Sequence, residues 1–152
     1  MYLKLSKARY WLVGLVTSVI ITACRVVLIG AYDENVDQSI QRISTEISTL
    51  MVKVEKNLDD NLPDQNKYEN FRDVYINLYG EVENLKIRTM ALPKYGKITE
   101  MVVLLDKNIH TLEALHKTGF TNRGVIAATK TLIEQSLKSM LSAQNALKRE
   151  SV

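Results

Sequence analysis

Glu113 and His116 have a spacing that would place a carboxylate and an imidazole side by side, because residues three apart are neighbours on a helix surface. This Glu-x-x-His pattern occurs in helical bundles that hold two iron or manganese ions. Such a centre needs a second Glu-x-x-His motif and two further inward glutamates, and the only other histidine is His110, on the same predicted helix. We therefore expect no metal site and interpret His116 as a residue near the negative end of a helix dipole.

Three other kinds of site each lack a required part. Covalent haem needs Cys-x-x-Cys-His, which is absent, and for non-covalent haem the available ligands are His110 with Met51 or Met140, although methionines more often fill gaps in a core. Nucleophilic catalysis needs a serine or cysteine activated by a base, and neither histidine has a glycine-framed serine nearby. A phosphate-binding loop needs clustered glycines, and the glycines of this chain are scattered. We expect no catalytic residue and no cofactor. An enzyme would need inward carboxylates, for which Glu46 and Glu100 are the candidates, although both are expected to face solvent.

Cys24 is the only cysteine, and it follows a basic N-terminus and the apolar residues 10–21. In bacterial lipoprotein signals, an aliphatic residue stands three positions before the cysteine and small residues fill the two positions between. Ile21, Thr22 and Ala23 fit this signal-peptidase pattern. The sequence therefore predicts cleavage before Cys24, a diacylglyceryl group on its sulfur and an N-acyl chain such as palmitate on its new amino group.

An uncleaved membrane anchor is the main alternative, because residues 10–29 are nearly all apolar and about 20 such residues span a bilayer. Arg25 argues against it, since a charge at the centre of a spanning helix costs about 2.5 to 3.5 kcal/mol. In both interpretations the positive residues precede the apolar segment, which sends the remainder of the chain out of the cytoplasm. A cytosolic protein with a buried cysteine is the third possibility.

The residue after the cysteine bears on location. By the known sorting rules for Gram-negative lipoproteins, an aspartate there favours retention at the inner membrane, and this chain has Arg25 instead. We expect the protein to lie at the periplasmic face of the outer membrane, with an inner-membrane anchor as the alternative. More than one acyl chain would hold it there stably.

Charge excludes one class of partner. The chain has 20 Lys and Arg against 17 Asp and Glu, and the predicted signal carries Lys4, Lys7 and Arg9 with no acidic residue, which leaves 17 of each sign. A formally neutral protein has no net positive charge to attract phosphate backbones, so we expect no nucleic-acid partner. With its only cysteine lipidated, the mature chain has no disulfide, and packing alone must stabilise one domain.

Four segments after Cys24 repeat apolar residues every three or four positions, as amphipathic helices do, and none resembles a strand. We expect helices over residues 34–58, 66–90 and 97–117, and a fourth that follows a cap at Thr121 or Asn122 and ends near residue 149. The short breaks predict an all-α, antiparallel up-down-up-down four-helix bundle. The expected core residues are, in chain order, Val36, Ile40, Ile43, Ile47, Leu50, Val54, Tyr68, Phe71, Tyr75, Leu78, Val82, Leu85, Ile98, Val102, Leu105, Ile109, Leu112, Ile126, Ile133, Leu137, Met140 and Leu147.

Several residues mark where these helices begin and end. Asp33 suits an N-cap, Pro63 interrupts the first connection, and Gly119 suits a C-cap. Gly80 lies inside the second helix, where glycine costs about 1 kcal/mol relative to alanine.

Tyr95 and Phe120 fall in predicted loops, where exposed aromatic residues often mark contact sites, and both are candidates for partner contact. In an up-down bundle Tyr95 would face the membrane and Phe120 would face away from it. Phe120 has an alternative role, packing back against the end of its helix.

Three local strings resemble a group of small helical lipoproteins of proteobacteria and their mobile elements, for which no activity is established. The resemblance covers most of the mature chain and implies the fold and the anchor rather than a function. The strings are Gly30-Ala31-Tyr32-Asp33, Leu112-Glu113-Ala114-Leu115-His116-Lys117-Thr118-Gly119-Phe120 and Ala146-Leu147-Lys148-Arg149.

The sequence thus predicts a signal peptide over residues 1–23, a short membrane-proximal tether over 24–32 and a helical bundle over 33–150. We expect a non-enzymatic, lipid-anchored periplasmic bundle that acts through contact with an envelope protein, as a scaffold or as an accessory or regulatory subunit. The alternative is a periplasmic carrier with a small-ligand pocket between helices. A carrier needs a cavity of several hundred cubic ångströms, whereas a contact module needs an exposed apolar patch.

Overall fold

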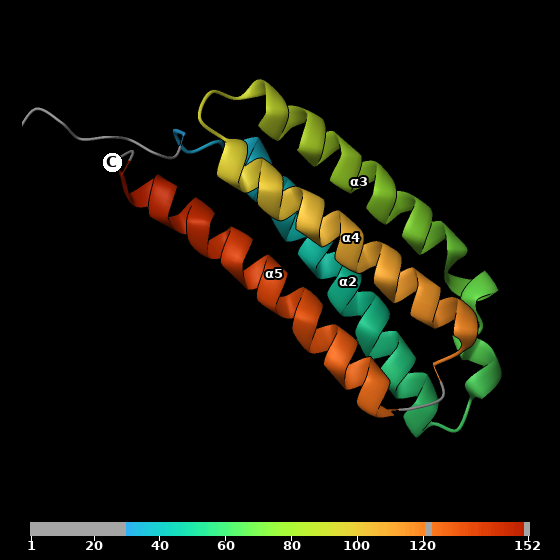
Figure 1. The fold of residues 1–152 in the computed structure, drawn as a ribbon. Coiled ribbons are helices and arrows are strands. Elements are labelled where there is room, and N and C mark those ends of the chain that lie inside the picture. The colour runs from blue at the N-terminus through green and yellow to red at the C-terminus, as the bar shows by residue number, and fades with distance from the viewer. Residues whose placement is uncertain (1–29, 121–122, 151–152) are drawn as a thin grey trace, which may run out of the picture.

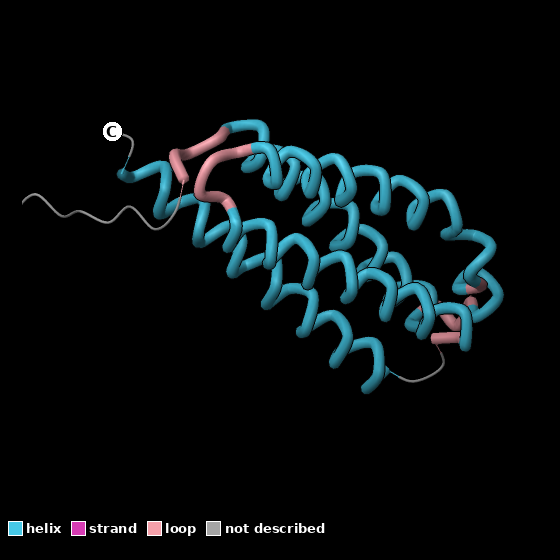
Figure 2. The backbone as a smooth tube through the Cα atoms, turned by 45° about the horizontal axis from the view of Figure 1, so that its top comes forward, coloured by secondary structure: helices cyan, strands magenta, loops and turns pink. Residues whose placement is uncertain are grey.

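The computed structural model describes residues 30–120 and 123–150, and this part of the chain is all-helical, with no strand (Figures 1 and 2). The candidate lipid-attachment residue Cys24 and the peptidase residues Ile21, Thr22 and Ala23 lie outside the described residues. The elements are α2 (Glu34–Asp59), the short 3-10 helices η1 (Pro63–Asn66) and η2 (Tyr68–Phe71), α3 (Arg72–Ala91), α4 (Gly96–Thr118) and α5 (Arg123–Glu150).

Helix α2 begins as the sequence predicts. Asp33 has an extended backbone, and its side chain accepts a hydrogen bond from the backbone N–H of Val36 at 2.9 Å, which satisfies one of the free donors of the first turn. Glu34 and Asp37 add negative charge at the positive end of the helix dipole. The helix ends one residue later than predicted, at Asp59.

The predicted start of the second helix is wrong, because α3 begins at Arg72 rather than near Asn66. Residues 63–71 form η1 and η2, which are separated at Lys67 by a backbone with φ −65° and ψ 138°. The side chain of Asn66 explains the difference. Its amide nitrogen donates to the backbone carbonyl of Val54 at 2.9 Å and its amide oxygen accepts from Asn57 at 2.8 Å, so the segment is fastened to the end of α2 before α3 can start.

Helix α4 ends at the predicted glycine. Gly119 has φ 95°, which few other residues adopt, and its N–H returns to the carbonyl of His116 at 2.9 Å. The predicted cap of the fourth helix, Thr121 or Asn122, lies outside the described residues.

The four long helices share one core. Helix α2 lies against α3 and α5, and α4 lies against the same two helices (Figure 1). The predicted core residues are buried, with the exception of Tyr68, which is half-buried. Met51, Tyr95 and Phe120 add buried side chains that the apolar stripes did not include.

Hydrogen bonds between distant residues define two ends of the molecule. At the first, called here the Gly30 end, residues 30–33 meet residues 88–99, for example through the N–H of Gly30 and the carbonyl of Lys94 at 3.1 Å. At the second, called the His116 end, residues 54–72 meet residues 112–123, for example through His116 and the carbonyl of Asn66 at 2.9 Å. Within the described residues, no helix is both long enough and apolar enough to cross a membrane.

Candidate functional site

The His116 end holds a cluster of rings that come from three elements. The ring centroid of His116 lies 4.9 Å from that of Phe71, 5.7 Å from that of Tyr75 and 4.5 Å from that of Phe120, on which it is stacked. Tyr68 closes the group, with its centroid 5.8 Å from that of Tyr75. Close aromatic pairs of this kind add about 0.5 to 1.5 kcal/mol each beyond the area that they bury.

Both ring nitrogens of His116 have protein partners. Nε2 lies 2.9 Å from the backbone carbonyl oxygen of Asn66, which can only accept, so Nε2 carries the proton. Nδ1 lies 3.0 Å from the hydroxyl of Tyr75, which donates to it. Burial lowers the pKa of His116, and the bond to Asn66 opposes this shift without reversing it. The imidazole is therefore uncharged at neutral pH. It lies in the last turn of α4, near the negative end of the helix dipole as the sequence predicts, but it carries no charge that would interact with that dipole.

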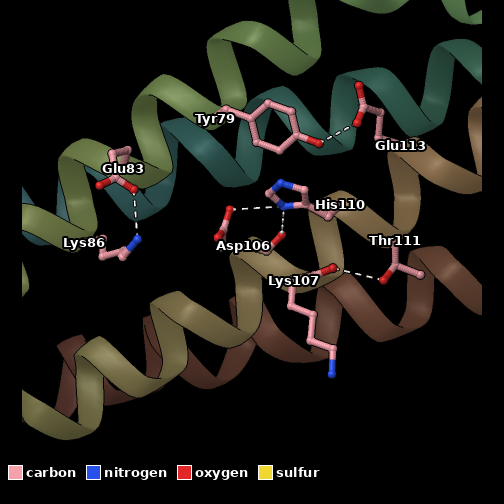
Figure 3. A network of polar contacts seen from close by, with 8 residues as sticks. All are labelled: Tyr79, Glu83, Lys86, Asp106, Lys107, His110, Thr111 and Glu113. Carbon is pink, nitrogen blue, oxygen red and sulfur yellow. Dashed lines mark hydrogen bonds and ion pairs between the residues drawn. The ribbon is translucent and has the colours of Figure 1, made fainter.

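The carboxylate of Glu113 also has protein partners. It accepts a hydrogen bond from the hydroxyl of Tyr79 at 2.8 Å (Figure 3). It also accepts one from the hydroxyl of Tyr68 at 2.7 Å and pairs with Lys117 at 3.0 Å. Burial alone would raise the pKa of Glu113, but these partners outweigh it and the pKa is lowered. Glu113 and His116 thus share a helix face, as their spacing predicts, yet each is turned to protein partners rather than to a common ligand.

His110 is exposed, and its Nδ1 lies 2.9 Å from the backbone carbonyl of Asp106, one turn earlier (Figure 3). Its ring packs against Tyr79, with centroids 4.5 Å apart. Met51 and Met140 are both buried in the core, whereas the side chain of His110 is exposed. Within the described residues, no three histidine, cysteine, aspartate or glutamate side chains are grouped as a metal site requires.

A hollow of about 640 Å³ opens at the His116 end. Its lining includes the rings of Tyr68, His116 and Phe120 and the charged side chains of Arg72 and Lys117. The hollow lies where η1 and η2 meet the end of α4, and not in the middle of the bundle between packed helices.

The Gly30 end is built around Tyr95. The Tyr95 ring packs so closely on Gly30 that an added Cβ there would lie 2.4 Å from a ring carbon and 2.7 Å from the backbone oxygen of Pro93. The Tyr95 hydroxyl donates to the carbonyl of Ala31 at 2.6 Å. The chain is therefore clamped to the loop between α3 and α4 before α2 begins.

An ion pair supports this clamp. Arg88 approaches Asp33 with two nitrogens, at 2.9 and 2.8 Å, while Asp33 also caps α2. The hydrogen bond from Arg88 is the main reason that the pKa of Asp33 is lowered. The buried Gln144 amide makes no hydrogen bond of normal geometry within the described chain. Burial raises the pKa of Tyr95, and the nearby Gln144 opposes this rise.

A second hollow, of about 500 Å³, lies beside the clamp between the end of α3 and the start of α4. Most of its lining is apolar and includes Met90, Leu92 and Val103, and Lys94 and Glu100 are also part of it. Met90 is 67% exposed and Val103 is 50% exposed. This concentration of apolar side chains was not found in the sequence, because Met90 and Val103 lie outside the core stripes of two separate helices.

The structure corrects the expectation for the two loop aromatics. Tyr95 and Phe120 are only 2% and 4% exposed, so neither is an exposed loop residue of the kind that marks contact sites. Tyr95 turns inward to reach Gly30 and Ala31, and Phe120 packs back on His116, which is the alternative role that the sequence left open for it.

The two carboxylates considered for enzymatic work do not converge. Glu100 is exposed and pairs with Lys97 at 2.9 Å. Glu46 is half-buried, and this burial, with a smaller contribution from Glu81, raises its pKa. The two lie on different helices, Glu46 on α2 and Glu100 on α4.

No protein-family model, curated protein or solved structure matches the chain.

Proposed function

We propose that this protein is a lipid-anchored module of the bacterial envelope that follows a lipoprotein signal and acts through protein contact rather than catalysis. In this proposal Cys24 carries the diacylglyceryl and N-acyl groups, and the antiparallel up-down-up-down four-helix bundle lies on the periplasmic side, at the outer membrane. The bundle presents its His116 end to a partner in the envelope.

The clamped position of Gly30 is the observation that carries the proposal. Only residues 25–29 separate Cys24 from Gly30, and the six steps from one Cα to the next span at most about 22 Å at 3.3 to 3.6 Å each. Because Gly30 is fixed to Tyr95 and Lys94, a lipid on Cys24 would hold the Gly30 end close to the membrane. Helix α3 alone has 20 residues, about 30 Å at 1.5 Å per residue, so the His116 end would face away from the bilayer.

The hollow at the His116 end supports a role in protein contact. Tyrosine, phenylalanine and arginine are enriched at interfaces, and well-packed pockets near the centre of an interface receive the side chains that contribute most to binding. This hollow is lined by Tyr68 and Arg72, and His116 in the same lining is held in place by two hydrogen bonds.

Site-specific photo-crosslinking in intact cells tests this proposal. A photoreactive amino acid at Arg72, in the lining of the hollow, should capture one defined envelope protein, identified by mass spectrometry. The control position is Val52, which is 56% exposed on α2 and is not part of the hollow. Capture that is equal at both positions, or absent at Arg72, would contradict a contact role for this end.

The volume of the same hollow favours one alternative, a carrier of small periplasmic molecules. A volume of about 640 Å³ lies within the range of small-molecule sites. Native mass spectrometry of the protein released from membranes separates the two functions. A carrier would retain a bound small molecule that Arg72→Ala removes, whereas a contact module would show the mass of the lipidated chain alone.

A further inference from the structure

We propose that the apolar hollow at the Gly30 end is a membrane-docking surface, in which Met90, Leu92 and Val103 enter the interfacial layer of the bilayer. The inference rests on the membrane attachment in the proposed function. It adds the surface that touches lipid and therefore the orientation of the bundle.

The first argument is the length of chain outside the described residues and the place where it ends. With a lipid on Cys24, residues 25–29 allow Gly30 no more than about 22 Å of separation from the Cα of Cys24. With residues 10–29 as a spanning helix instead, Gly30 would lie directly at the bilayer surface. Either kind of attachment brings the same end of the bundle to the membrane.

The second argument is the chemistry of that end. Its hollow of about 500 Å³ has a mainly apolar lining, and two of its side chains, Met90 and Val103, are at least half exposed. Burying such side chains gains about 25 cal/mol for each Å² of apolar surface removed from water. Lys94 is also part of the lining, and a long cationic side chain of this kind can reach lipid phosphates while its stem follows an apolar surface.

The third argument is the rigidity of the surface. Tyr95 belongs to the lining and is also the ring that clamps Gly30, so the hollow and the point where the tether enters the fold form one unit. The ion pair of Arg88 with Asp33 fastens the end of α3 to the start of α2 in the same unit. Docking would therefore orient the whole bundle and would not merely attach one loop.

The experiment places a single tryptophan at two positions of α3 in the full chain. The sequence has one tryptophan, Trp11, which lies in the predicted signal peptide. A Trp11→Phe background keeps the introduced indole the only one even where the leader is retained. Met90→Trp tests the hollow. Ile76→Trp is the matched control, because Ile76 is 59% exposed and lies 14 residues, about 21 Å, nearer the His116 end of the same helix.

The lipidated proteins are reconstituted into phosphatidylethanolamine and phosphatidylglycerol vesicles with brominated acyl chains. We expect Met90→Trp to shift its emission to shorter wavelength and to lose most of its intensity through bromine quenching. Ile76→Trp should keep the emission that it has in vesicles without bromine. Val103→Trp provides a second test position if Met90→Trp lowers the melting temperature.

Three results would overturn the inference. An unquenched indole at both positions would mean that the bundle stands clear of the bilayer, and quenching at both would mean that it lies flat. A blue-shifted but unquenched Met90→Trp would mean that protein covers the hollow. Flotation and the mass of the Cys24 peptide, measured on the same samples, show whether the anchor itself is present, so its failure is distinguishable from failure of docking.

Discussion

The neutral state of His116 is the main chemical feature at the scale of single residues. Its two ring nitrogens connect Tyr75 on α3 with the backbone of Asn66 on η1, so three elements depend on one uncharged ring. The folded protein holds the pKa of His116 below its usual 6.5, whereas the unfolded chain protonates normally. As the pH falls below 6.5, the unfolded state binds a proton at His116 more readily than the folded state does. The contribution of His116 to the free energy of unfolding is therefore complete above this pH and decreases below it.

Chemical unfolding at a series of pH values tests this account of His116. We expect the free energy of unfolding to fall below pH 6.5 with a limiting slope of about 1.4 kcal/mol per pH unit. His116→Gln should remove this slope, and it should cost about 1 to 3 kcal/mol at neutral pH because hydrogen-bond partners are lost or displaced. Asp33 and Glu113 also have lowered pKa values, and their contributions to stability are lost as the pH falls below their usual pKa values of 3.8 and 4.5. These losses therefore occur at lower pH than that of His116.

The control for this series is His110→Gln, which changes the exposed histidine of the same helix and should keep the slope of the parent protein. A slope that survives in His116→Gln and disappears in His110→Gln would contradict the assignment.

Local spacing predicts only part of this site. It places Glu113 and His116 on one helix face, but Tyr75 and Asn66 lie 41 and 50 residues from His116 in the chain, and no local pattern joins them. The same limit applies to Tyr95, whose burial depends on Ala31, 64 residues earlier. Contacts formed by side chains from separate elements could therefore not be predicted from local spacing.

At the scale of elements, glycines in different environments should respond to alanine with opposite signs. Gly30→Ala would place a Cβ 2.4 Å from the Tyr95 ring and 2.7 Å from the Pro93 oxygen, and we expect a cost of about 1 to 3 kcal/mol. Gly80→Ala has open space around it in the middle of α3, and we expect a gain of about 1 kcal/mol from helix propensity.

Urea unfolding of the two glycine variants beside the parent protein measures both changes. Equal stability of the two variants would show that Tyr95 does not clamp Gly30 as described, because helix propensity alone cannot separate them in this way.

The buried stripe of α2 makes a second prediction at this scale. Ile43 is fully buried, so Ile43→Asp should lower the free energy of unfolding by several kcal/mol, about 3 to 5, by placing an unpaired charge in the core. Val52→Asp is the control on the same helix, where 56% exposure predicts a change within about 0.5 kcal/mol. Similar melting temperatures for the two variants would mean that the buried face of α2 is assigned wrongly.

The helices could be predicted well because each requires only local information. Apolar spacing found the buried faces of all four, and Asp33 and Gly119 marked real helix ends. The start of α3 could not be predicted, since Asn66 continues the helical pattern in sequence but is held by Val54 and Asn57 from α2. A tertiary contact there overrides local propensity.

At the scale of the whole molecule, the two ends have different surfaces. The Gly30 end carries an apolar hollow beside the point where the chain enters the fold, and the His116 end carries a hollow lined by aromatic and charged side chains. The long helices separate the ends, so in our proposal one faces lipid and the other faces a partner (Figure 1). Attachment at Cys24 is what would give these ends their orientation.

The most direct measurement is the mass of the protein isolated from membranes, together with radiolabelled palmitate incorporation, for the parent chain and for Cys24→Ala. We predict that the parent protein begins at Cys24, carries diacylglyceryl and N-acyl groups and incorporates the label. Cys24→Ala should remain an unlabelled precursor that retains residues 1–23. A parent protein with an intact leader and a free thiol, or membrane partition unchanged by Cys24→Ala, would contradict the lipid anchor.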